Sequence, residues 1–377
     1  MSYSIPFNRP TLVGSEFDYI QQSIADGKIS GDGIFTKKCH KFLEEAVGVP
    51  KVLLTTSCTH ALEMSAILLN IQAGDEVIVP SFTFVTSVNA FVLRGAKPVF
   101  VDIRQDTLNI DETKIEAAIT PKTKAIVVVH YAGVACEMDT IMEIANRHHI
   151  PVVEDNAHGL FGKYKGKNLG TFGGLATQSF HETKNFQCGE GGALLINDPQ
   201  YIERAEIIRE KGTNRSRFFR GQVDKYSWVD IGSSYLPSDM LAAFLYAQLE
   251  ARDQIQQKRQ AIWEHYNTEL HTWAIQNDVR LPIIPAECEQ TYHMFYILMP
   301  SLDSRQALIE HLKSNGILAV FHYLPLHLSD MGRGFGGQTG DCPVTEDLSD
   351  RLLRLPFYNS MTHDEQTRVI ACLMQFS

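Results

Sequence analysis

The sequence predicts an α/β protein with two parts: an α/β/α sandwich built on a mostly parallel sheet, and a smaller C-terminal α+β domain. Two observations support this prediction. Between about residues 51 and 237, short apolar runs rich in β-branched residues alternate with amphipathic segments, which is typical of parallel sheets covered by helices. After about residue 238 the alternation ends, and a long helical pattern precedes a mixture of helices and strands. A chain of 377 residues is long enough for two such domains.

The predicted strands of the large domain are seven short apolar runs, at residues 52–54, 76–79, 98–101, 125–129, 151–153, 175–180 and 193–196. The helices expected between them lie at residues 61–69, 85–93 and 138–145. Because neighbouring parallel strands end at the same edge of their sheet, we expect a ligand site at the carboxyl ends of these strands.

The C-terminal part should begin with a long helix. Ser238 and Asp239 are typical helix-capping residues, and the apolar residues that follow predict a helix that runs past Trp263. Further elements are predicted as strands at residues 294–299 and 317–323, helices at residues 305–314, 345–353 and 363–373, and a glycine-rich loop at residues 331–345. We therefore expect three regions: residues 1–50, which pack with the small domain; residues 51–237, the large domain; and residues 238–377, the linking helix and small domain.

Composition and charge argue against several classes of protein. Asp and Glu outnumber Lys and Arg by 44 to 34, and the net charge of −10 argues against general binding to nucleic acid or anionic membranes. No apolar run is long enough to span a bilayer, and the first residues lack the basic and apolar regions of a secretion signal. The seven cysteines are scattered and form no CxxC pair, so we expect a cytosolic protein with reduced thiols and no metal.

One motif is misleading. The segment Gly332-Arg-Gly-Phe-Gly-Gly matches G-x-G-x-x-G, but no predicted strand precedes it and no βαβ unit contains it. The dinucleotide fingerprint requires that context, so we interpret this segment as a flexible loop.

Three other motifs follow predicted strands and carry chemistry. The first is Ser57-Cys-Thr-His-Ala-Leu, where a strand gives way to a helix. Backbone N–H groups and the positive end of the helix dipole favour a phosphate there. The alternative interpretation is an ordinary helix cap.

The second motif is Val152-Val-Glu-Asp-Asn-Ala-His, in which two carboxylates end an apolar strand. A carboxylate at this edge could hold a proton on a ligand nitrogen through a charge-assisted hydrogen bond. In isolation, a turn or capping acid would be the simpler interpretation.

The third motif is Ser179-Phe-His-Glu-Thr-Lys-Asn, followed by the glycine-rich turn Gly189-Glu-Gly-Gly. A lysine between two strands, beside such a turn, could lie at the bottom of a cleft. With a lowered pKa, Lys184 could form a Schiff base, although most lysines are only solvated surface charges.

Together, a phosphate cradle, an acid for a ring nitrogen and a Schiff-base lysine are the parts of a pyridoxal phosphate site. The sequence also resembles the DegT/DnrJ family of sugar aminotransferases over essentially its whole length. The stretches that carry this resemblance are Ser81-Phe-Thr-Phe-Val, Asn89-Ala-Phe-Val-Leu-Arg-Gly-Ala, His130-Tyr-Ala-Gly-Val-Ala-Cys-Glu-Met-Asp, Ser179-Phe-His-Glu-Thr-Lys-Asn, Arg220-Gly-Gln-Val-Asp-Lys-Tyr and Phe321-His-Tyr-Leu-Pro-Leu-His. It implies the fold-type I, aspartate aminotransferase-like architecture and pyridoxal 5'-phosphate as cofactor.

The resemblance also implies roles for individual residues. Lys184 matches the lysine that binds the cofactor covalently and acts as the catalytic base. Asp155 matches the acid that pairs with the protonated pyridine nitrogen. His158 stands where the family has Gln or His near the phenolic oxygen of the cofactor, and Phe84 matches the aromatic residue that stacks on its ring.

Phosphate binding is implied for Cys58, Thr59 and Ser179. Many relatives also carry an Asn that reaches the phosphate of the neighbouring subunit, within a segment that matches residues 232–239. Here Ser234 replaces that Asn, which puts in doubt how much the partner subunit contributes. The resemblance nevertheless implies a homodimer with active sites at the subunit interface.

The implied reaction transfers the amino group of glutamate to C4 of dTDP-4-keto-6-deoxyglucose and gives the galacto product. The gluco epimer and a 3-keto sugar remain open as alternatives. An anionic dTDP group needs positive charge, which the basic run around Arg215 and Arg220 offers, with a solvated loop as the alternative. Tyr235, His322 and Tyr323 are the other expected substrate residues.

Two rival functions are weighed against this one. Related sugar 3-dehydratases use the same cofactor but have His in place of the lysine, so Lys184 argues against them. A non-enzymatic regulator is the second rival. No helix-turn-helix is evident in the sequence, and the net charge is wrong for DNA.

Overall fold

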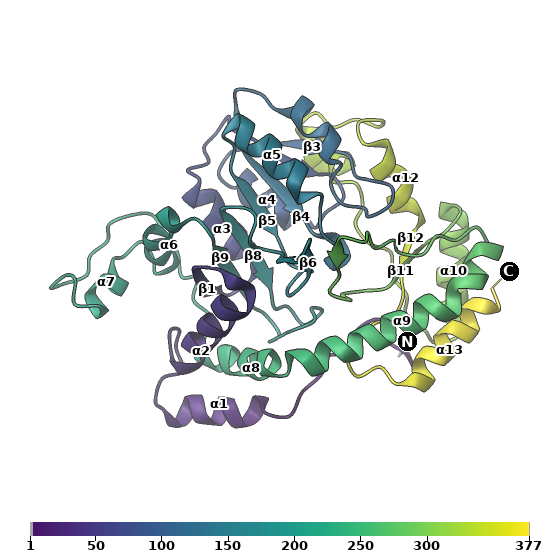
Figure 1. Ribbon diagram of the computed structural model, residues 1–377, viewed down its shortest axis with the longest axis horizontal. Coiled ribbons are helices and arrows are strands. Elements are labelled where there is room, and N and C mark those ends of the chain that lie inside the picture. The colour runs from purple at the N-terminus through teal and green to yellow at the C-terminus, as the bar shows by residue number, and fades with distance from the viewer. Residues whose placement is uncertain (1–2, 377) are drawn as a thin grey trace.

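The computed structural model describes residues 3–376 and has the two parts that the sequence predicts (Figure 1). The large part is built on a seven-stranded sheet of order β1-β9-β8-β5-β4-β2-β3. Its strands are β1 (Lys51–Thr55), β2 (Glu76–Pro80), β3 (Lys97–Val101), β4 (Thr123–Val129), β5 (Val152–Asp155), β8 (Leu175–Ser179) and β9 (Gly192–Ile196). Only the two pairings of β9 are antiparallel. Each strand falls on one of the seven predicted apolar runs.

Helices cover both faces of this sheet, because successive strand residues point to opposite faces. Val77 and Val79 pack beneath α3 (Cys58–Leu68), α4 (Thr86–Val92) and α6 (Ile202–Arg209). Ile78 faces the other side, where α5 (Met138–His148) covers the strands from β3 to β5. On that same side, α2 (Ile34–Leu43) and α8 (Asp239–Glu250) cover β1, β9 and β8.

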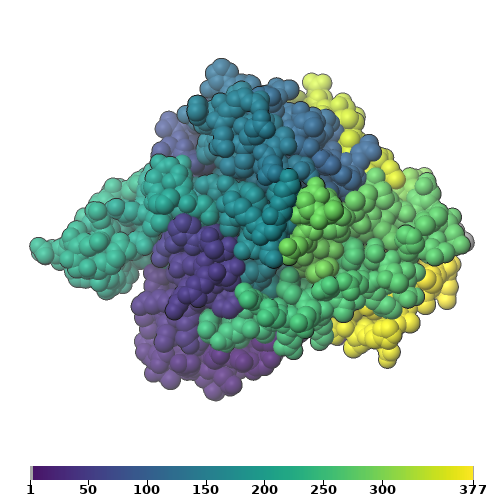
Figure 2. Space-filling model, viewed as in Figure 1, coloured from purple at the N-terminus to yellow at the C-terminus, as the bar shows by residue number. Residues whose placement is uncertain are grey.

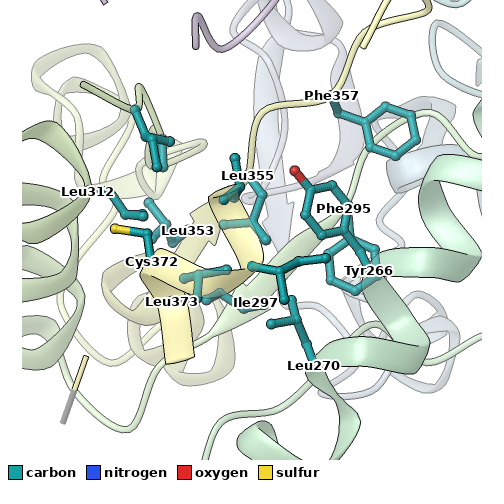
Figure 3. Close-up of a cluster of buried hydrophobic side chains, with 14 of the residues drawn as sticks. Tyr266, Leu270, Phe295, Ile297, Leu312, Leu353, Leu355, Phe357, Cys372 and Leu373 are labelled. Atoms are coloured by element: carbon teal, nitrogen blue, oxygen red, sulfur yellow. The ribbon is translucent and has the colours of Figure 1, made fainter. Parts of the chain in front are cut away.

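The small domain has a core of its own (Figure 3). A two-stranded sheet, β11 (Tyr296–Leu298) with β12 (Leu352–Arg354), packs with α9 (Arg252–Gln276), α10 (Leu302–Ser314) and α13 (His363–Met374). Tyr266 and Phe295 are fully buried at its centre, and their rings lie 5.2 Å apart. Both domains therefore bury separate apolar cores.

Three expectations about this region need correction. The predicted single long helix is two helices, since the chain breaks at Ala251 (φ −88°, ψ 16°) between α8 and α9. Residues 317–323 form no regular strand and make only single bridges, from Ile317 to Ile5 and from Val320 to Arg354. The expected loop at residues 331–345 contains most of α11 (Asp330–Gly334) and the start of α12 (Pro343–Arg351).

Short elements that the sequence did not reveal complete the fold. A three-stranded sheet joins β6 (Lys163–Tyr164), β7 (Lys167–Asn168) and β10 (Cys288–Glu289). The helix α7 (Arg215–Phe219) lies in residues 213–231, a segment that projects from the large domain and is called the arm below (Figure 1). Short 3₁₀ or π segments lie at Glu44–Gly48, Glu112–Lys114, Glu116–Ala118, Tyr131–Gly133, Pro199–Tyr201 and Leu326–Leu328. Within residues 3–376, no helix is long and apolar enough to cross a membrane.

The N-terminal segment is divided between the two domains. Ile5 pairs with Ile317 and lies in the core of the small domain, as expected for residues 1–50. The helices α1 (Glu16–Ala25) and α2 instead pack against α8 on the large domain. These two helices are held on the large domain, and not on the small domain as expected, by a buried acid at the start of α8.

That acid is Asp239, whose side chain caps α2 rather than its own helix. It accepts hydrogen bonds from Phe35 N (3.2 Å), Thr36 N (2.8 Å) and Thr36 Oγ1 (2.7 Å). It also accepts one from Ser23 Oγ of α1 at 3.3 Å. Asp239 thus satisfies N–H groups that a helix start leaves without intrahelical partners, and it joins three helices.

We predict that Asp239→Ala will lower the free energy of unfolding by roughly 2–4 kcal/mol, because it leaves buried N–H groups without acceptors. Urea unfolding followed by circular dichroism measures this loss. Asp253→Ala is a matched control, since Asp253 also lies in the first turn of a helix but its side chain is 82% exposed. Equal stability of the two variants would contradict the capping role.

Candidate active site

A cavity of about 780 Å³ opens at the carboxyl edge of the large sheet, where the two domains meet. With one exception, Ser234, every residue to which the sequence analysis assigned a cofactor contact lines it: Cys58, Thr59, Phe84, Asp155, His158, Ser179 and Lys184. Of the expected substrate residues, His322 and Tyr323 line the cavity, whereas Arg215, Arg220 and Tyr235 do not. Residues far apart in the chain are thus brought together at one place.

The sheet itself places several of these residues. Asp155 is the last residue of β5, Ser179 is the last residue of β8, and Ser57 follows β1 closely. Strand β9 runs the opposite way, so Gly192 at its beginning lies at the same edge. A Cβ atom on Gly192 would lie 2.3 Å from the Ser57 carbonyl carbon and 2.4 Å from Cys58 N. Only glycine allows this close backbone approach.

The start of α3 forms one wall of the cavity. Ser57 caps the helix, and its Oγ accepts a hydrogen bond from His60 N at 3.2 Å. Cys58 and Thr59 follow as the first helical residues and line the cavity. The first N–H groups of a helix have no intrahelical partners, so this wall suits a phosphate.

Asp155 is the acid of the site. It is buried, its Oδ2 accepts a hydrogen bond from Ser87 Oγ (2.6 Å), and its Oδ1 accepts one from Ala157 N (3.2 Å). Burial raises the pKa of Asp155 above its usual value, and the hydrogen bond from Ser87 opposes this effect.

The neighbouring acid, Glu154, has a structural role. His130 Nδ1 accepts a hydrogen bond from Cys136 N (3.2 Å), so His130 Nε2 carries the ring proton and donates it to Glu154 at 2.9 Å. Glu154 also accepts three backbone N–H groups at 2.7–2.8 Å, from Gly170, Phe172 and Gly173. Both Glu154 oxygens are thus bound by His130 and by the loop at residues 170–173, and Glu154 does not line the cavity. Of the two adjacent acids, Asp155 is therefore the candidate for binding a ligand nitrogen.

Lys184 lies in the loop between β8 and β9, and its backbone N donates to His181 O at 2.9 Å. Burial lowers the pKa of Lys184 to about 8, although the Asp155 carboxylate favours the charged amine. A lysine of this kind is partly neutral near physiological pH and can act as a nucleophile or a base.

Two stacked histidines lie beside the lysine. The rings of His158 and His293 are 4.2 Å apart, and burial lowers the pKa of both well below the usual range, so they are neutral. Asn185 Nδ2 donates to Thr291 O at 2.7 Å. Asn185 Oδ1 is therefore the acceptor for His293 Nδ1 at 2.9 Å, and that nitrogen carries the ring proton.

His158 also has a buried Nδ1 with no hydrogen-bond partner. A buried N–H without an acceptor costs more than an unused lone pair. This cost favours the tautomer in which Nε2 of His158 carries the proton and can donate to a ligand.

Several cavity residues were missed by the sequence analysis: Phe7, Asn8, Thr83, Ser87, His293 and Arg354. Thr83 and Ser87 follow β2, so their position after a strand was a signal that could have been used. His293 and Arg354 come from the small domain and have no local signal, because only tertiary packing brings them to the sheet edge.

The predicted basic run lies elsewhere. Figure 2 shows the arm that carries α7 projecting away from the body of the molecule. Arg215 pairs with Glu210 at 3.1 Å, and Arg220 pairs with Glu206 at 2.7 Å. Within one chain these arginines are thus held by acids in and next to α6 rather than at the cavity.

Two further expected residues also lie outside the cavity. Tyr235 is buried against the ring of His60 at 5.1 Å, and its hydroxyl donates to Glu63 at 3.4 Å. Ser234 forms a backbone bridge with Glu210. Their assigned roles stay predictions. Within residues 3–376, no group of three His, Cys, Asp or Glu side chains could hold a metal ion.

Known proteins share this sequence and fold. A model of the DegT/DnrJ/EryC1/StrS aminotransferase family matches residues 10–374. The Methanocaldococcus jannaschii protein MJ1066 is 34% identical, over 98% of this chain and 96% of its own. The aminotransferase TlmJ of Streptoalloteichus hindustanus superposes with a TM-score of 0.90 at 30% identity and 98% coverage of both chains. The PLP form of the Streptococcus pneumoniae sugar aminotransferase Spr1654 superposes with a TM-score of 0.91 at 26% identity. The match covers 99% of this chain and 98% of Spr1654.

We predict that Lys184 of the cofactor-free protein will react with an amine-labelling reagent with a midpoint near pH 8, because burial favours its neutral form. An unperturbed lysine titrates at about pH 10.4. Competitive labelling with peptide mass spectrometry measures both profiles in one sample, with exposed Lys41 on α2 for comparison. Parallel profiles for the two lysines would contradict the effect of burial.

Proposed function

Because the chain belongs to the DegT/DnrJ/EryC1/StrS aminotransferase family, we propose that it transfers the amino group of glutamate to C4 of dTDP-4-keto-6-deoxyglucose. The product would be dTDP-4-amino-4,6-dideoxygalactose, as for a transaminase of the WecE type. The observation that carries this proposal is the convergence of Lys184, Asp155 and the start of α3 in one buried cavity. The cofactor is pyridoxal phosphate, and the fold is fold-type I, as the sequence predicted.

The residues of the cavity fit this cofactor. The close contact of Gly192 with Ser57 and Cys58 leaves the start of α3 free of side chains from β9, where a phosphate would bind. Asp155 can hold a proton on a ring nitrogen, and the unpaired Nδ1 of His158 leaves its Nε2 to donate to a phenolic oxygen. Phe84 is 55% exposed at the cavity wall, where an aromatic ring could stack on it.

Bound pyridoxal phosphate would supply an electron sink for negative charge at the carbon next to the transferred nitrogen. Lys184 would hold the cofactor through Nζ until the amino group of the donor takes its place. The released amine, partly neutral near pH 8, could then take a proton from the substrate and return it. Asp155, when ionised, keeps positive charge on the ring nitrogen through a charge-assisted hydrogen bond. The buried walls exclude water, which strengthens this electrostatic interaction.

Anionic substrates need positive charge in the cavity. Among the cavity-lining residues that the structure describes, Arg354 is the only arginine. Its Nη2 donates to Phe321 O at 3.0 Å, and its buried Nε has no partner. Arg354, with His322 and Tyr323 beside it, can therefore bind a carboxylate or phosphate of a substrate.

The decisive experiment incubates the purified enzyme with glutamate and dTDP-4-keto-6-deoxyglucose and assigns the product by NMR coupling constants. The expected product is the galacto amino sugar, and Lys184→Ala should lose both turnover and the visible absorbance of the bound cofactor. A gluco product or activity only on a 3-keto sugar would replace the specific assignment. A colourless protein without aminotransferase activity would overturn the enzymatic function.

We predict that the two adjacent acids will respond differently to substitution. Asp155→Asn should fold normally but lose several kcal/mol of transition-state stabilisation, on the order of other electrostatic supports. Glu154→Gln should reduce stability, because its amide NH₂ meets N–H donors in a buried loop. Turnover and urea unfolding of both variants test this, and near-normal turnover of Asp155→Asn would contradict the assignment.

We propose that the enzyme is a homodimer in which the arm takes part in the interface. Phe219 is 70% exposed and Trp228 is 79% exposed on this arm, and apolar groups gathered on a projecting surface mark interaction sites. In a dimer the arm could carry Arg215 and Arg220 to the cavity of the partner.

Light scattering should therefore give twice the chain mass, and Trp228→Ser should weaken the dimer by about tenfold or more. Ile275→Ser on α9 is the control, because Ile275 is also 70% exposed but lies on another part of the molecule. A monomer with full activity would refute the dimer.

A further inference from the structure

Two buried hydroxyl groups connect to the acid of the site. Ser87 Oγ lies 2.6 Å from Asp155 Oδ2, and Thr83 Oγ1 lies 2.8 Å from Ser87 Oγ. Thr83 and Ser87 line the cavity, yet their exposed fractions are 1% and 0%. Neither residue has a role in the function proposed above.

The direction of these hydrogen bonds follows from the chemistry of the groups. An ionised carboxylate can only accept, so Ser87 must donate its single proton to Asp155. Ser87 can then only accept from Thr83, whose hydroxyl donates. The result is a directed chain from Thr83 through Ser87 to Asp155, and its O···O distance of 2.6 Å is typical of a charge-assisted bond.

The position of Ser87 in α4 supports a specific purpose. Val85 caps this helix without a side-chain hydrogen bond, and the Ser87 hydroxyl serves no helix carbonyl. Ser65 of α3 shows the ordinary behaviour of a buried helical serine, since its Oγ donates to Ala61 O, four residues earlier, at 2.9 Å.

We infer that Ser87, supported by Thr83, is a positioning residue that keeps the Asp155 carboxylate ionised and fixed in one orientation toward the cavity. The inference rests on the proposed function, which gives Asp155 its role. The carboxylate is held at both oxygens, by Ser87 on Oδ2 and by Ala157 N on Oδ1. Two hydrogen bonds at different oxygens define the plane of the group.

The other groups around Asp155 cannot replace this contribution. Lys184 favours the ionised acid only while its own amine is charged, which its lowered pKa limits. His130, which is fully buried, donates its proton to Glu154. Burial raises the pKa of the Cys58 thiol and of the Tyr323 hydroxyl, so neither carries charge. The neutral thiol is a weak donor, and its Sγ lies 4.0 Å from Asp155 Oδ1 but 3.5 Å from Thr177 Oγ1. The Ser87 hydroxyl, in contrast, does not titrate near physiological pH, so its ability to donate a hydrogen bond to the ionised form of Asp155 does not depend on pH there.

The test follows the ¹³Cγ resonance of Asp155 in the cofactor-free protein as a function of pH, assigned by comparison with Asp155→Asn. In Ser87→Ala the titration midpoint of Asp155 should rise by about one pH unit or more, since a hydrogen bond to a charged group is lost. Ser87→Thr, which keeps the hydroxyl, should restore the wild-type midpoint. Thr83→Val should give a smaller shift in the same direction.

The loaded enzyme gives a second readout. Ser87→Ala should lower kcat by about tenfold with little change in the KM for glutamate, because this fully buried hydroxyl donates its only proton to Asp155 and has none left for a substrate. A raised pKa leaves more Asp155 protonated at low pH, so the defect should shrink as the pH rises. Ser65→Ala, a buried serine outside the site, should change neither the midpoint nor kcat.

An unchanged Asp155 midpoint in Ser87→Ala would overturn the inference, as would an equal shift in Ser65→Ala. If Ser87→Ala is poorly folded by circular dichroism, Ser87→Cys, which keeps the shape but donates weakly, should show the same upward shift. Because the titration needs no cofactor, its failure is separate from that of the proposed function, which would fail if Asp155→Asn were fully active.

Discussion

The structure depends on burying an acid and an amine at the same edge of one sheet. Burial acts on the two groups in opposite directions, since it raises the pKa of Asp155 and lowers that of Lys184, and so moves both toward their neutral forms. At Asp155, the hydrogen bonds from Ser87 and Ala157 and the nearby positive charge of Lys184 oppose the effect of burial. In the proposed function Lys184 needs the opposite outcome, because a nucleophile or base must be the neutral amine. The surrounding fold therefore has to support one charge and suppress the other within a single cavity.

Asn185, the neighbour of Lys184 in the chain, connects the loop that carries Lys184 to the small domain. Its side chain binds Thr291 O and His293, and its backbone O accepts from Asn359 Nδ2 at 3.3 Å. All three partners belong to the small domain, whereas the loop of Lys184 belongs to the large sheet. The apolar core of the small domain, shown in Figure 3, thus serves the site indirectly by holding these partners in place.

Sequence patterns predicted the parts of this molecule that are locally determined. The seven strands follow from apolar runs. The motifs that contain Asp155 and Lys184 follow from their places after strands, whereas the choice of these two residues came from the family resemblance. The motif alone could not decide between Glu154 and Asp155, because the answer depends on the loop at residues 170–173 that binds Glu154. His293 and Arg354 were missed for the same reason, since only tertiary packing brings them to the sheet edge. The break at Ala251 was missed because both flanking segments favour helix.

The antiparallel strand β9 also has a consequence for how the chain acquires its structure. In the sheet, β1 has a single neighbour, β9, and Lys51 pairs with Ile196. In the described part of the chain β1 has no other partner in this sheet, so it can pair only after β9, one of the last strands of the large domain, has been synthesised. Pairings of such high sequence separation form slowly, because the loop must close before the contacts reward it. Because Gly192 of β9 lies against Ser57 and Cys58, we expect the start of α3 to take its final position only after this late closure.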